Sequence, residues 1–400
     1  MTEILLIIFF ISVLLFFLGS GIWVALSMIG VSAIGMMLFT SRPVGDAMAT
    51  TIWGTSSSWT LTALPLFVWM GEILFRTKLS ENLFKGLSPW MQKLPGGLIH
   101  VNVVGCALFA AISGSSAATV ATVGKMSIPE LRKRNYPEKI LLGSLAGSGT
   151  LGLLIPPSII LIIYGVAVQE SIAKLFIAGI IPGIMIALIF MSYVIIWSLI
   201  NKKSMPKIIE EYSFLEKIKR SKQLLPVIIL ILAVIGSIYT GIATATEAAS
   251  LGVVGALILS YFQNSLTLKT FKSSLLGATK TSCMIAFILA GSTFLSLAMG
   301  FTGLPRNLAL WIQNMDLSPY VLIFVLMIFY IILGMFLDGI SAVVLTMAII
   351  EPMIRQAGFD MIWFGIFLVV VVEMAQITPP VGFNLFVLQG MANKDMGYIA

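Results

Sequence analysis

Two pairs of adjacent prolines interrupt apolar segments of the chain, Pro156-Pro157 and Pro379-Pro380. Because proline has no amide donor, each pair leaves carbonyl oxygens in the preceding turn without a helical partner. A glycine-rich run at 147–152 precedes the first pair, and we expect the backbone to open there. Uncharged oxygens that converge on an unwound helix suit Na+, a hard cation that prefers oxygen ligands. The two proline pairs therefore predict two alkali-ion sites.

Two further segments combine glycine with hydroxyl or carboxyl groups, and we expect each of them to face one interrupted helix. The first is the turn at 113–116, and the second is Asp338-Gly339. Small polar residues that merely pack between membrane helices are the alternative interpretation. The candidate ion ligands are Ser113, Gly114, Ser115, Ser116, Thr119, Gly149, Thr150 and Gly152 in one half, and Gly339, Ser341, Gln376, Thr378 and Pro379 in the other.

Acidic residues inside apolar segments cost free energy in a bilayer and require a reason. Asp338 is the best functional candidate among them, with the N-cap of a following helix as the alternative. Glu373 lies in a long apolar run and is expected to be paired or to face a cavity, whereas Glu247 is expected at a helix start. With few acids and one histidine, His100, a proton relay has few groups available, so sodium coupling is favoured while proton coupling stays open.

Membrane helices are the elements that must position these residues. Hydrophobic residues make up 58% of the 400 residues and charged residues only 10%, with a mean hydropathy of +1.04. Soluble domains carry about 25% charged residues, so the composition excludes a soluble domain and predicts an all-α, polytopic membrane protein. No cleavable signal peptide is indicated, and Cys106 and Cys283 are expected to be small buried hydrophobes.

Basic segments predict which side of the membrane each loop faces. Residues 201–222 contain seven Lys or Arg, 125–139 contain five and 76–93 contain four, and Lys269, Lys272 and Lys280 form another cluster. We expect all of them on the cytoplasmic side, where they explain the net charge of +7 without nucleic acid. The apolar limbs between two of these segments are shorter than the roughly 20 residues that a spanning helix needs. They predict a re-entrant helical hairpin.

An internal repeat with one constant shift in residue number relates Pro129 to Pro352, Arg132 to Arg355 and the first proline pair to the second. The second hairpin is flanked by segments poor in basic residues, so we expect it to open to the opposite side, although its first limb at 319–337 is long enough to span. Inverted repeats with broken helices are typical of secondary transporters. The predicted organisation begins with membrane scaffold helices at 1–75. A first repeat at 76–200 contains a hairpin at 98–129 and a broken helix at 140–164, and a basic cytoplasmic linker follows at 201–222. A second repeat at 223–400 contains a hairpin at 319–354 and a broken helix at 361–392.

Four segments resemble the large membrane subunit of TRAP transporters, the tripartite ATP-independent periplasmic transporters. These segments are AAISGSSAATVATVGKMSIPEL, GSGTLGLLIPPSIILIIYG, GIATATEAA and ITPPVGFN. The resemblance covers nearly the whole chain and implies a sodium-driven elevator of the bacterial inner membrane, which is not an enzyme and carries two or more Na+ ions. It also implies a small membrane subunit and a periplasmic binding protein that delivers an organic anion.

The resemblance assigns roles to matching positions of this chain. The first ion site would combine the turn at 113–116 with Gly149 to Pro156, and the second would combine Gly339 and Ser341 with Thr378 and Pro379. Residues 53–90 resemble the sialic acid branch of the family, which also includes transporters of C4-dicarboxylates. Family members usually continue into a further apolar helix, which would follow Ala400. The implied substrate contacts are Ser115, Ser116, Ser158 and Asp338.

The sequence also leaves functions other than a TRAP transporter subunit open. An autonomous H+- or Na+-coupled dicarboxylate carrier would need no partner and could use Glu373 or Asp338. An intramembrane serine protease would pair Ser115 or Ser116 with His100, and a passive channel would need no coupling ion. The run at 147–152 also matches the GxGxxG pattern of dinucleotide-binding loops, but no strand precedes it and no acid follows at the required distance.

Overall fold

The computed structural model describes residues 3–77, 79–206, 212–222, 224–303, 307, 318–380 and 382–399. Throughout these residues the regular secondary structure is helical, which confirms the predicted all-α class. Four predicted features fall partly or wholly outside the described residues: Lys78 of the basic cluster, 207–211 of the linker, most of the segment before the second hairpin, and Ala400.

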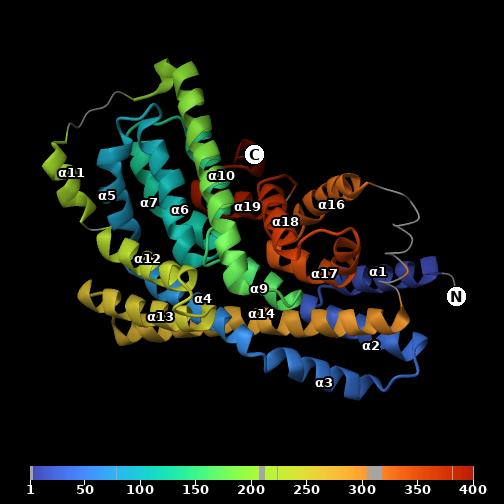
Figure 1. The fold of residues 1–400 in the computed structure, drawn as a ribbon. Coiled ribbons are helices and arrows are strands. Elements are labelled where there is room, and N and C mark those ends of the chain that lie inside the picture. Colours follow the sequence, from blue (N-terminus) through green and yellow to red (C-terminus); the bar gives the residue numbers. More distant parts are fainter. Residues whose placement is uncertain are drawn as a thin grey trace.

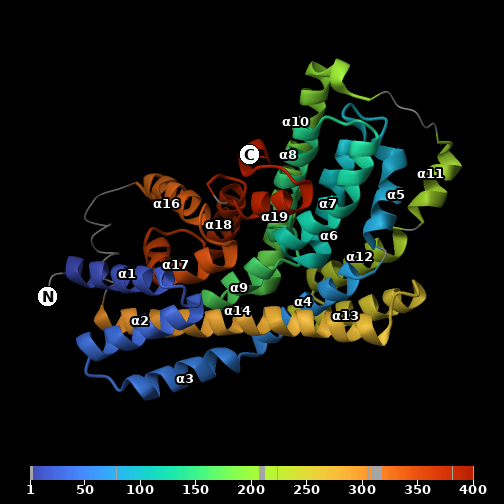
Figure 2. The ribbon, with the colours of Figure 1, turned by 180° about the vertical axis from the view of Figure 1, so that it is seen from behind.

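One layer of helices, here called the scaffold layer, is built from the N-terminal helices and from helices of the middle of the chain. Helix α14 packs against α2, α3 and α4, while α13 packs against α4 and α12. Figures 1 and 2 show α2, α3, α13 and α14 along one side of the molecule. The layer consists of α1 (Glu3–Gly19), α2 (Val24–Phe39), α3 (Val44–Ser56), η1 (Trp59–Thr62), α4 (Ala63–Phe75), α12 (Leu225–Tyr239), α13 (Ala245–Phe262) and α14 (Leu268–Thr302).

The remaining helices form a second group, here called the hairpin body, on the other side of α4 and α14 (Figure 1). Its first half contains α5 (Leu79–Met91), η2 (Gly97–Ile99), α6 (His100–Ser113), α7 (Ser116–Lys133), α8 (Glu138–Gly149), η3 (Thr150–Leu153) and α9 (Ile159–Ala167). Its second half contains α16 (Pro319–Gly334), α17 (Gly339–Gln356), α18 (Met361–Gln376), α19 (Phe383–Ala392) and α20 (Met396–Ile399). The connection back to the scaffold layer runs through α10 (Ile172–Ile200), η4 (Lys202–Ser204) and α11 (Phe214–Ser221).

Several helices have the length and apolar composition of membrane spans. Within the described residues there are four such helices, or up to six if each bent helix pair is counted as one span. Exposed apolar side chains cover α10, for example Ile181 at 78% and Ile200 at 77% exposure. Surfaces of this kind are stable only against lipid or another apolar partner. The chain is therefore a multi-pass membrane protein.

The bounds of the helices repeat at the same constant shift as the prolines. Helix α7 begins at Ser116 and α17 at Gly339, while α8 begins at Glu138 and α18 at Met361. The two halves also interlock, because α7 packs against α19 of the other half and α17 packs against α9. Both Pro-Pro peptide bonds are cis. The opposite orientation of the halves in a membrane stays a prediction.

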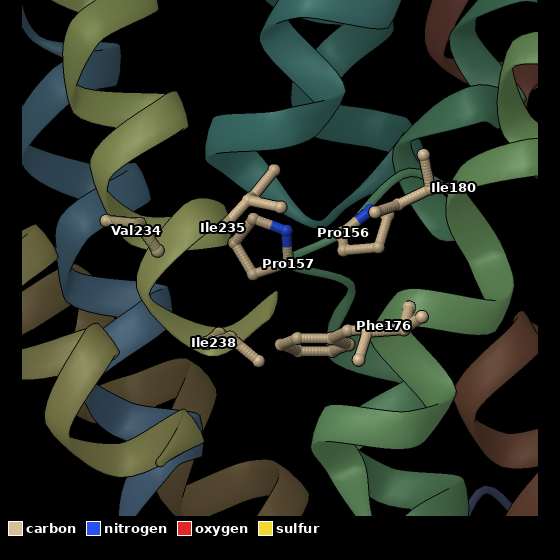
Figure 3. Close-up of a pocket in the computed structure, with 8 residues that line it drawn as sticks. Pro156, Pro157, Phe176, Ile180, Val234, Ile235 and Ile238 are labelled. Atoms are coloured by element: carbon tan, nitrogen blue, oxygen red, sulfur yellow. The ribbon is translucent and has the colours of Figure 1, made fainter. Parts of the chain in front are cut away.

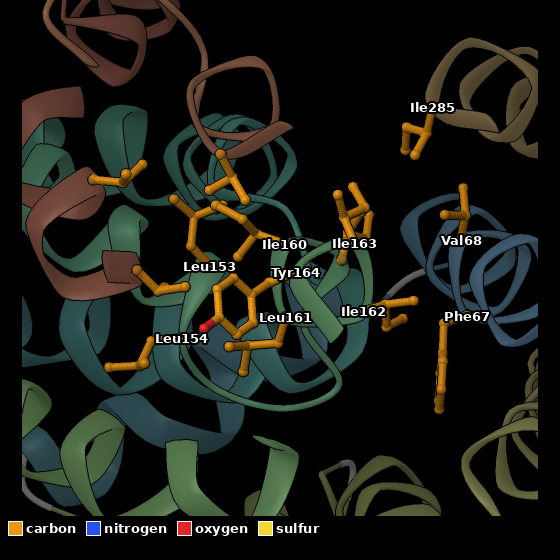
Figure 4. Packing of buried hydrophobic residues seen from close by; sticks show 14 of the residues in the cluster. Phe67, Val68, Leu153, Leu154, Ile160, Leu161, Ile162, Ile163, Tyr164 and Ile285 are labelled. Atoms are coloured by element: carbon orange, nitrogen blue, oxygen red, sulfur yellow. The ribbon is translucent and has the colours of Figure 1, made fainter. Parts of the chain in front are cut away.

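Helix α9 lies where the two halves meet the scaffold layer. Residues 160–164 are fully buried, and Figure 4 shows them beside Leu153 and Leu154, with Phe67 of α4 and Ile285 of α14 nearby. Its nine residues are nearly all apolar, as expected for a helix that is surrounded by protein on every side. This core holds the segment after the first proline pair in place.

The first broken helix opens later than predicted. Residues 147–152 are not unwound, because α8 continues to Gly149 and a 3-10 turn follows to Leu153. Proline at 156 or 157 can remove only the bonds to the carbonyls of residues 152 and 153. A carbonyl oxygen before residue 152 has a hydrogen-bond donor: Gly147 O accepts from Thr150 Oγ1 at 2.8 Å. The irregular backbone is therefore limited to 154–158.

Two predicted lengths were also wrong. The basic segment 125–139 is mostly helix, since α7 continues through Pro129 to Lys133. Arg132 and Lys133 lie in its last turn, where cations interact favourably with the helix dipole. The first limb of the second hairpin, α16, has 16 residues, or about 24 Å, and is shorter than the roughly 30 Å of a bilayer core.

Candidate functional site

The tip of the first hairpin is a tight polar turn between α6 and α7. Gly114 ends α6 with φ +60, a left-handed conformation that favours glycine. Ser115 caps α7 by accepting a hydrogen bond from Ala118 N at 3.5 Å. Ser113 Oγ lies 2.9 Å from Thr119 Oγ1, which donates to Ser115 O at 2.7 Å. Three oxygens of the turn are thereby held within hydrogen-bonding distance of one another.

The first broken helix lies directly against this turn. Ile159 N donates to Gly114 O at 3.3 Å, so the start of α9 bonds to the tip. A Cβ placed on Gly152 would lie 2.6 Å from Ser115 O and 2.7 Å from Thr119 Oγ1. Only glycine permits this approach, because real Cβ atoms do not come that close to backbone atoms. The predicted pairing of the turn with the broken helix is a direct contact.

The tip of the second hairpin is organised by Asp338. Its Oδ2 accepts hydrogen bonds from Ile340 N at 3.1 Å and Ser341 N at 3.2 Å, so the side chain is the N-cap of α17. A Cβ on Gly339 would lie 3.0 Å from Gln376 Nε2 and 3.2 Å from Ile160 Cδ1. The second tip therefore contacts α18 of its own half and α9 of the other half.

A hydrogen bond joins the two predicted ion sites. Ser116 Oγ, at the first tip, donates to Gln376 Oε1, at the end of α18, at 2.7 Å. Both side chains are buried. The predicted sites assigned these two residues to different halves of the chain, so the bond connects groups that are 260 positions apart. The two tips and the second broken helix thus form one polar cluster.

A cavity of about 1210 Å³ lies in front of this cluster. Both tips line it, as do Leu153, Ile159, Gln376 and Phe383 near the broken helices. Helices α2, α4 and α14 of the scaffold layer supply the opposite wall, which is mainly apolar and includes Trp23, Val24, Ala25, Val68, Gly71, Glu72, Phe75, Lys280, Thr281, Cys283, Met284, Ile285, Phe287 and Ile288. The cavity therefore lies between the hairpin body and the scaffold layer.

Several of the predicted site residues do not line the cavity, and they lie behind it or beside it. Ser158 is buried, donates to Leu153 O and caps α9 by accepting from Leu161 N. Thr150 bonds within its own turn, and Gly149 packs against Val120. Pro156 meets apolar side chains of α10 and α12 in a small pocket (Figure 3). In the second break, Thr378 Oγ1 donates to Met374 O at 2.6 Å.

The second break is more open than the first. Pro379 and Pro380 are exposed and Thr378 is half-buried, whereas Pro156 and Pro157 are buried. The tip residues Gly339 and Ser341 are nevertheless buried. The predicted second set therefore divides into Gly339, Ser341 and Gln376, which line the cavity, and Thr378 and Pro379, which do not.

Two residues near the cavity, Cys283 and Glu373, differ from expectation. Cys283, predicted as buried, is exposed and lines the cavity. Lys280 lines the cavity from the interior of α14, and its cytoplasmic location stays a prediction. The sequence feature that could have indicated a cavity position for Lys280 and Cys283 is their location at the start of the apolar run 281–300. Glu373, expected to be paired or to face the cavity, is buried with no hydrogen-bond partner for Oε1 among the described residues and does not line the cavity.

The other acids have structural partners. Glu247 forms a capping box with Thr244 at the start of α13, as the helix-start interpretation predicted. Glu72 of α4 pairs with Arg76, and Glu351 pairs with Arg355 at 2.9 Å in α17. Glu72 also lines the cavity.

The arrangement does not support a serine nucleophile. His100 lies at the beginning of α6, and its Nε2 is 2.8 Å from Pro95 O. Ser115 follows the far end of the same helix, whose 14 residues correspond to about 21 Å. A general base must lie within hydrogen-bonding reach of its nucleophile. His100 therefore does not lie within reach of Ser115 or Ser116 as a general base.

The chemistry of the cluster suits an alkali ion. Its ligands would be hydroxyl, amide and carbonyl oxygens from Ser113, Ser115, Ser116, Thr119 and Gln376. Within the described ranges, no three His, Cys, Asp or Glu side chains gather as a metal site. Hard oxygens without thiolate or imidazole favour hard cations over transition metals.

The bond between the two halves yields a first test. Ser116→Ala and Gln376→Leu should each lower the free energy of unfolding by about 1–3 kcal/mol, because each leaves a buried polar partner unsatisfied. The double variant should cost less than the sum, with a coupling energy of about 1 kcal/mol. SDS titration in mixed micelles measures these values.

The matched control combines Gln376→Leu with Ser198→Ala, a buried serine that bonds only within α10. That pair should be additive. Additivity of Ser116→Ala with Gln376→Leu would contradict the contact between the halves.

Comparison with known proteins places this geometry in context. Residues 9–400 match the family described as "Tripartite ATP-independent periplasmic transporter, DctM component". The C4-dicarboxylate TRAP transporter large permease protein DctM of Pseudomonas aeruginosa is 33% identical over 91% of this chain and 85% of its own length. The sialic acid TRAP transporter large permease protein SiaM of Vibrio cholerae is 30% identical over 93% and 86%.

The fold also resembles a solved transporter. The crystal structure of the Alcanivorax borkumensis YdaH transporter matches with a TM-score of 0.65, covering 96% of this chain and 93% of that chain. The sequence identity is 12%, so this likeness concerns the fold alone.

Proposed function

The chain belongs to the DctM-component family of tripartite ATP-independent periplasmic transporters, and on this premise we propose that it imports a carboxylate-bearing organic anion together with Na+. The observation that supports the proposal most directly is the hydrogen bond that joins Ser116 of the first hairpin tip to Gln376 of the second broken helix, at the edge of the cavity that both tips line. Neutral oxygens at the tips suit the ion, and the adjacent cavity has room for an organic acid. Two or more Na+ ions are transported in each cycle.

Coupling follows from electrostatics. A carboxylate next to the Asp338 side chain is repelled unless a cation lies between or beside them. Na+ at the tips offsets this repulsion and orders the turns, so the anion binds after the ions. Each net positive charge that moves inward gains roughly 2.3 kcal/mol per 100 mV. Two ions carried with a monocarboxylate therefore provide a net driving force.

The motion that we propose is an elevator. The hairpin body carries the ions and the anion, and it slides as a rigid unit against the scaffold layer. The location of the cavity between these two groups of helices is consistent with this motion, because movement along their interface changes the side to which the cavity opens. Interlocking of α7 with α19 and of α17 with α9 keeps the two halves of the hairpin body together.

Partners and location follow from the family. We propose a periplasmic protein that delivers the substrate, a small membrane subunit that binds the scaffold layer, and residence in the bacterial inner membrane. Sialic acid is our first candidate substrate because residues 53–90 resemble that branch. A C4-dicarboxylate is the second, since the Pseudomonas aeruginosa relative is named for that class.

Reconstitution tests the proposal. Proteoliposomes with this chain and the small subunit should accumulate radiolabelled acid only with an inward Na+ gradient and only with the binding protein present. Sialic acid and succinate are compared in separate reactions. Accumulation by this chain alone, driven by a pH gradient, would instead support an autonomous proton-coupled carrier, and uptake that never exceeds the external concentration would indicate a channel.

A further inference from the structure

The scaffold wall of the cavity carries a single positive charge. Of the residues that line the cavity, only Glu72, Lys280 and Asp338 are charged. Lys280 lies in the interior of α14, which begins at Leu268, and the separation of these two residues corresponds to about 18 Å along the helix. Its side chain is exposed and therefore reaches the open space of the cavity.

The two acids of the cavity already interact with donors. Glu72 of α4 pairs with Arg76, which directly follows the helix, and Arg76 Nε also donates to Ser273 Oγ at 3.2 Å. The Asp338 carboxylate accepts two backbone hydrogen bonds at the start of α17. Among the residues that the structure describes, Lys280 forms no ion pair. The wall thus presents one ammonium group that forms no ion pair, while the Glu72 carboxylate, which lies 2.6 Å from where a Cβ on Gly277 of α14 would be, is paired with Arg76.

An ammonium group that forms no ion pair beside low-dielectric walls requires a reason. The lining near Lys280 is apolar on α14, with Met284 and Ile285 in the following turn. Apolar walls strengthen the attraction between an ammonium group and an anion, and they concentrate anions in the cavity. The hairpin tips supply neutral oxygens and one acid, which do not attract a carboxylate by themselves.

We propose that Lys280 is the residue that pairs with a carboxylate of the transported anion while the hairpin body faces this part of the scaffold layer. The inference rests on the proposed function and adds the group that recognises the negative charge. A lysine ammonium is a point charge on a flexible stem, so it accepts carboxylates in varied orientations. Because Lys280 is on the scaffold layer, movement of the hairpin body separates it from the bound anion and breaks the pair.

A native thiol reports on this charge. Cys283 is three residues after Lys280 on the same helix, lines the same cavity and is exposed. Residues three apart on a helix are neighbours. Cys106 is buried and does not line the cavity. Thiol reagents of opposite charge therefore measure the potential beside Lys280.

The first experiment labels the purified complex of this chain and its small subunit. The Cys283 thiolate attacks a methanethiosulfonate reagent, forms a mixed disulfide and releases methanesulfinate. One reagent carries a sulfonate and the other a trimethylammonium group. The ratio of their rates cancels any change in the thiolate fraction. Lys280→Gln is expected to lower the sulfonate-to-ammonium ratio by about fivefold or more.

The matched control is Lys272→Gln, an exposed lysine on the same helix that does not line the cavity. It should leave the ratio unchanged, and Lys280→Arg should keep it. A ratio that does not fall in Lys280→Gln, or that falls equally in Lys272→Gln, would overturn the assignment. Circular dichroism and size-exclusion profiles establish that each variant is folded.

The second experiment measures transport in proteoliposomes. Lys280→Gln should raise the KM for the acid about tenfold, leave the Na+ concentration for half-maximal uptake unchanged, and recover in Lys280→Arg. An unchanged KM would overturn the pairing. If the wild-type complex transports no acid at all, the proposed function fails, whereas the labelling ratio still decides whether Lys280 attracts anions into the cavity.

Discussion

Replacement of Gly152 by alanine is expected to reduce Na+-driven uptake by more than about 100-fold, equivalent to roughly 2.7 kcal/mol. The new Cβ would lie 2.6 Å from Ser115 O and 2.7 Å from the Ser115 carbonyl carbon. These backbone atoms cannot move freely, because the neighbouring Gly114 O accepts a hydrogen bond from Ile159 N. The tip must therefore separate from the broken helix, and the oxygens of the first site lose their arrangement.

The measurement is the initial rate of labelled acid uptake per reconstituted complex. Gly143→Ala is the matched control, because Gly143 lies in the preceding turns of α8 with nothing within 4 Å of its added Cβ. That variant should transport normally and be as stable as the wild type or slightly more, since alanine favours helix. Normal transport by Gly152→Ala would show that the contact between tip and broken helix is not needed.

Replacement of Asp338 by asparagine is expected to reduce uptake at least about tenfold while leaving the fold intact. Asparagine is as good an N-cap as aspartate, so the start of α17 should persist. What is lost is the negative charge at the cavity, which favours a cation at the second tip. The Na+ concentration for half-maximal uptake should rise. Asp338→Ala removes the cap as well and should cost about 1 kcal/mol more in stability.

Asp360 provides the matched control for this prediction. It caps α18 by accepting from Trp363 N at 2.9 Å and does not line the cavity. Asp360→Asn should therefore leave uptake and Na+ dependence unchanged. If Asp338→Asn and Asp360→Asn behave alike in uptake assays and in apparent melting temperature, the Asp338 carboxylate acts only as a cap.

The elements around the candidate site could be predicted from local chemistry. Glycine at the end of a short apolar limb and Ser115 at the start of the next indicated a turn, and the structure has Gly114 at φ +60 and Ser115 as an N-cap. Asp338 occupies the equivalent position in the second half of the repeat and caps α17 in the same way. Such features depend on neighbouring residues, so a single sequence contains them.

The site itself depends on contacts that the sequence does not encode locally. The bond between Ser116 and Gln376 joins residues that no spacing rule relates. The position of the opening was wrong because side-chain and 3-10 bonds keep Thr150 and its neighbours helical almost up to the prolines. That Lys280 lines the cavity could not be predicted, because a lysine next to a basic cluster has the same sequence pattern whether it faces water or a cavity.

Both tips are expected to hold Na+ that moves together with the anion. Parallel counting of 22Na+ and labelled acid in the same proteoliposomes, with the membrane potential clamped at zero, tests it most directly. We expect saturable entry of at least two Na+ per acid molecule, with both fluxes lost together in Gly152→Ala. Accumulation of the acid against its gradient without any accompanying 22Na+ entry would contradict it.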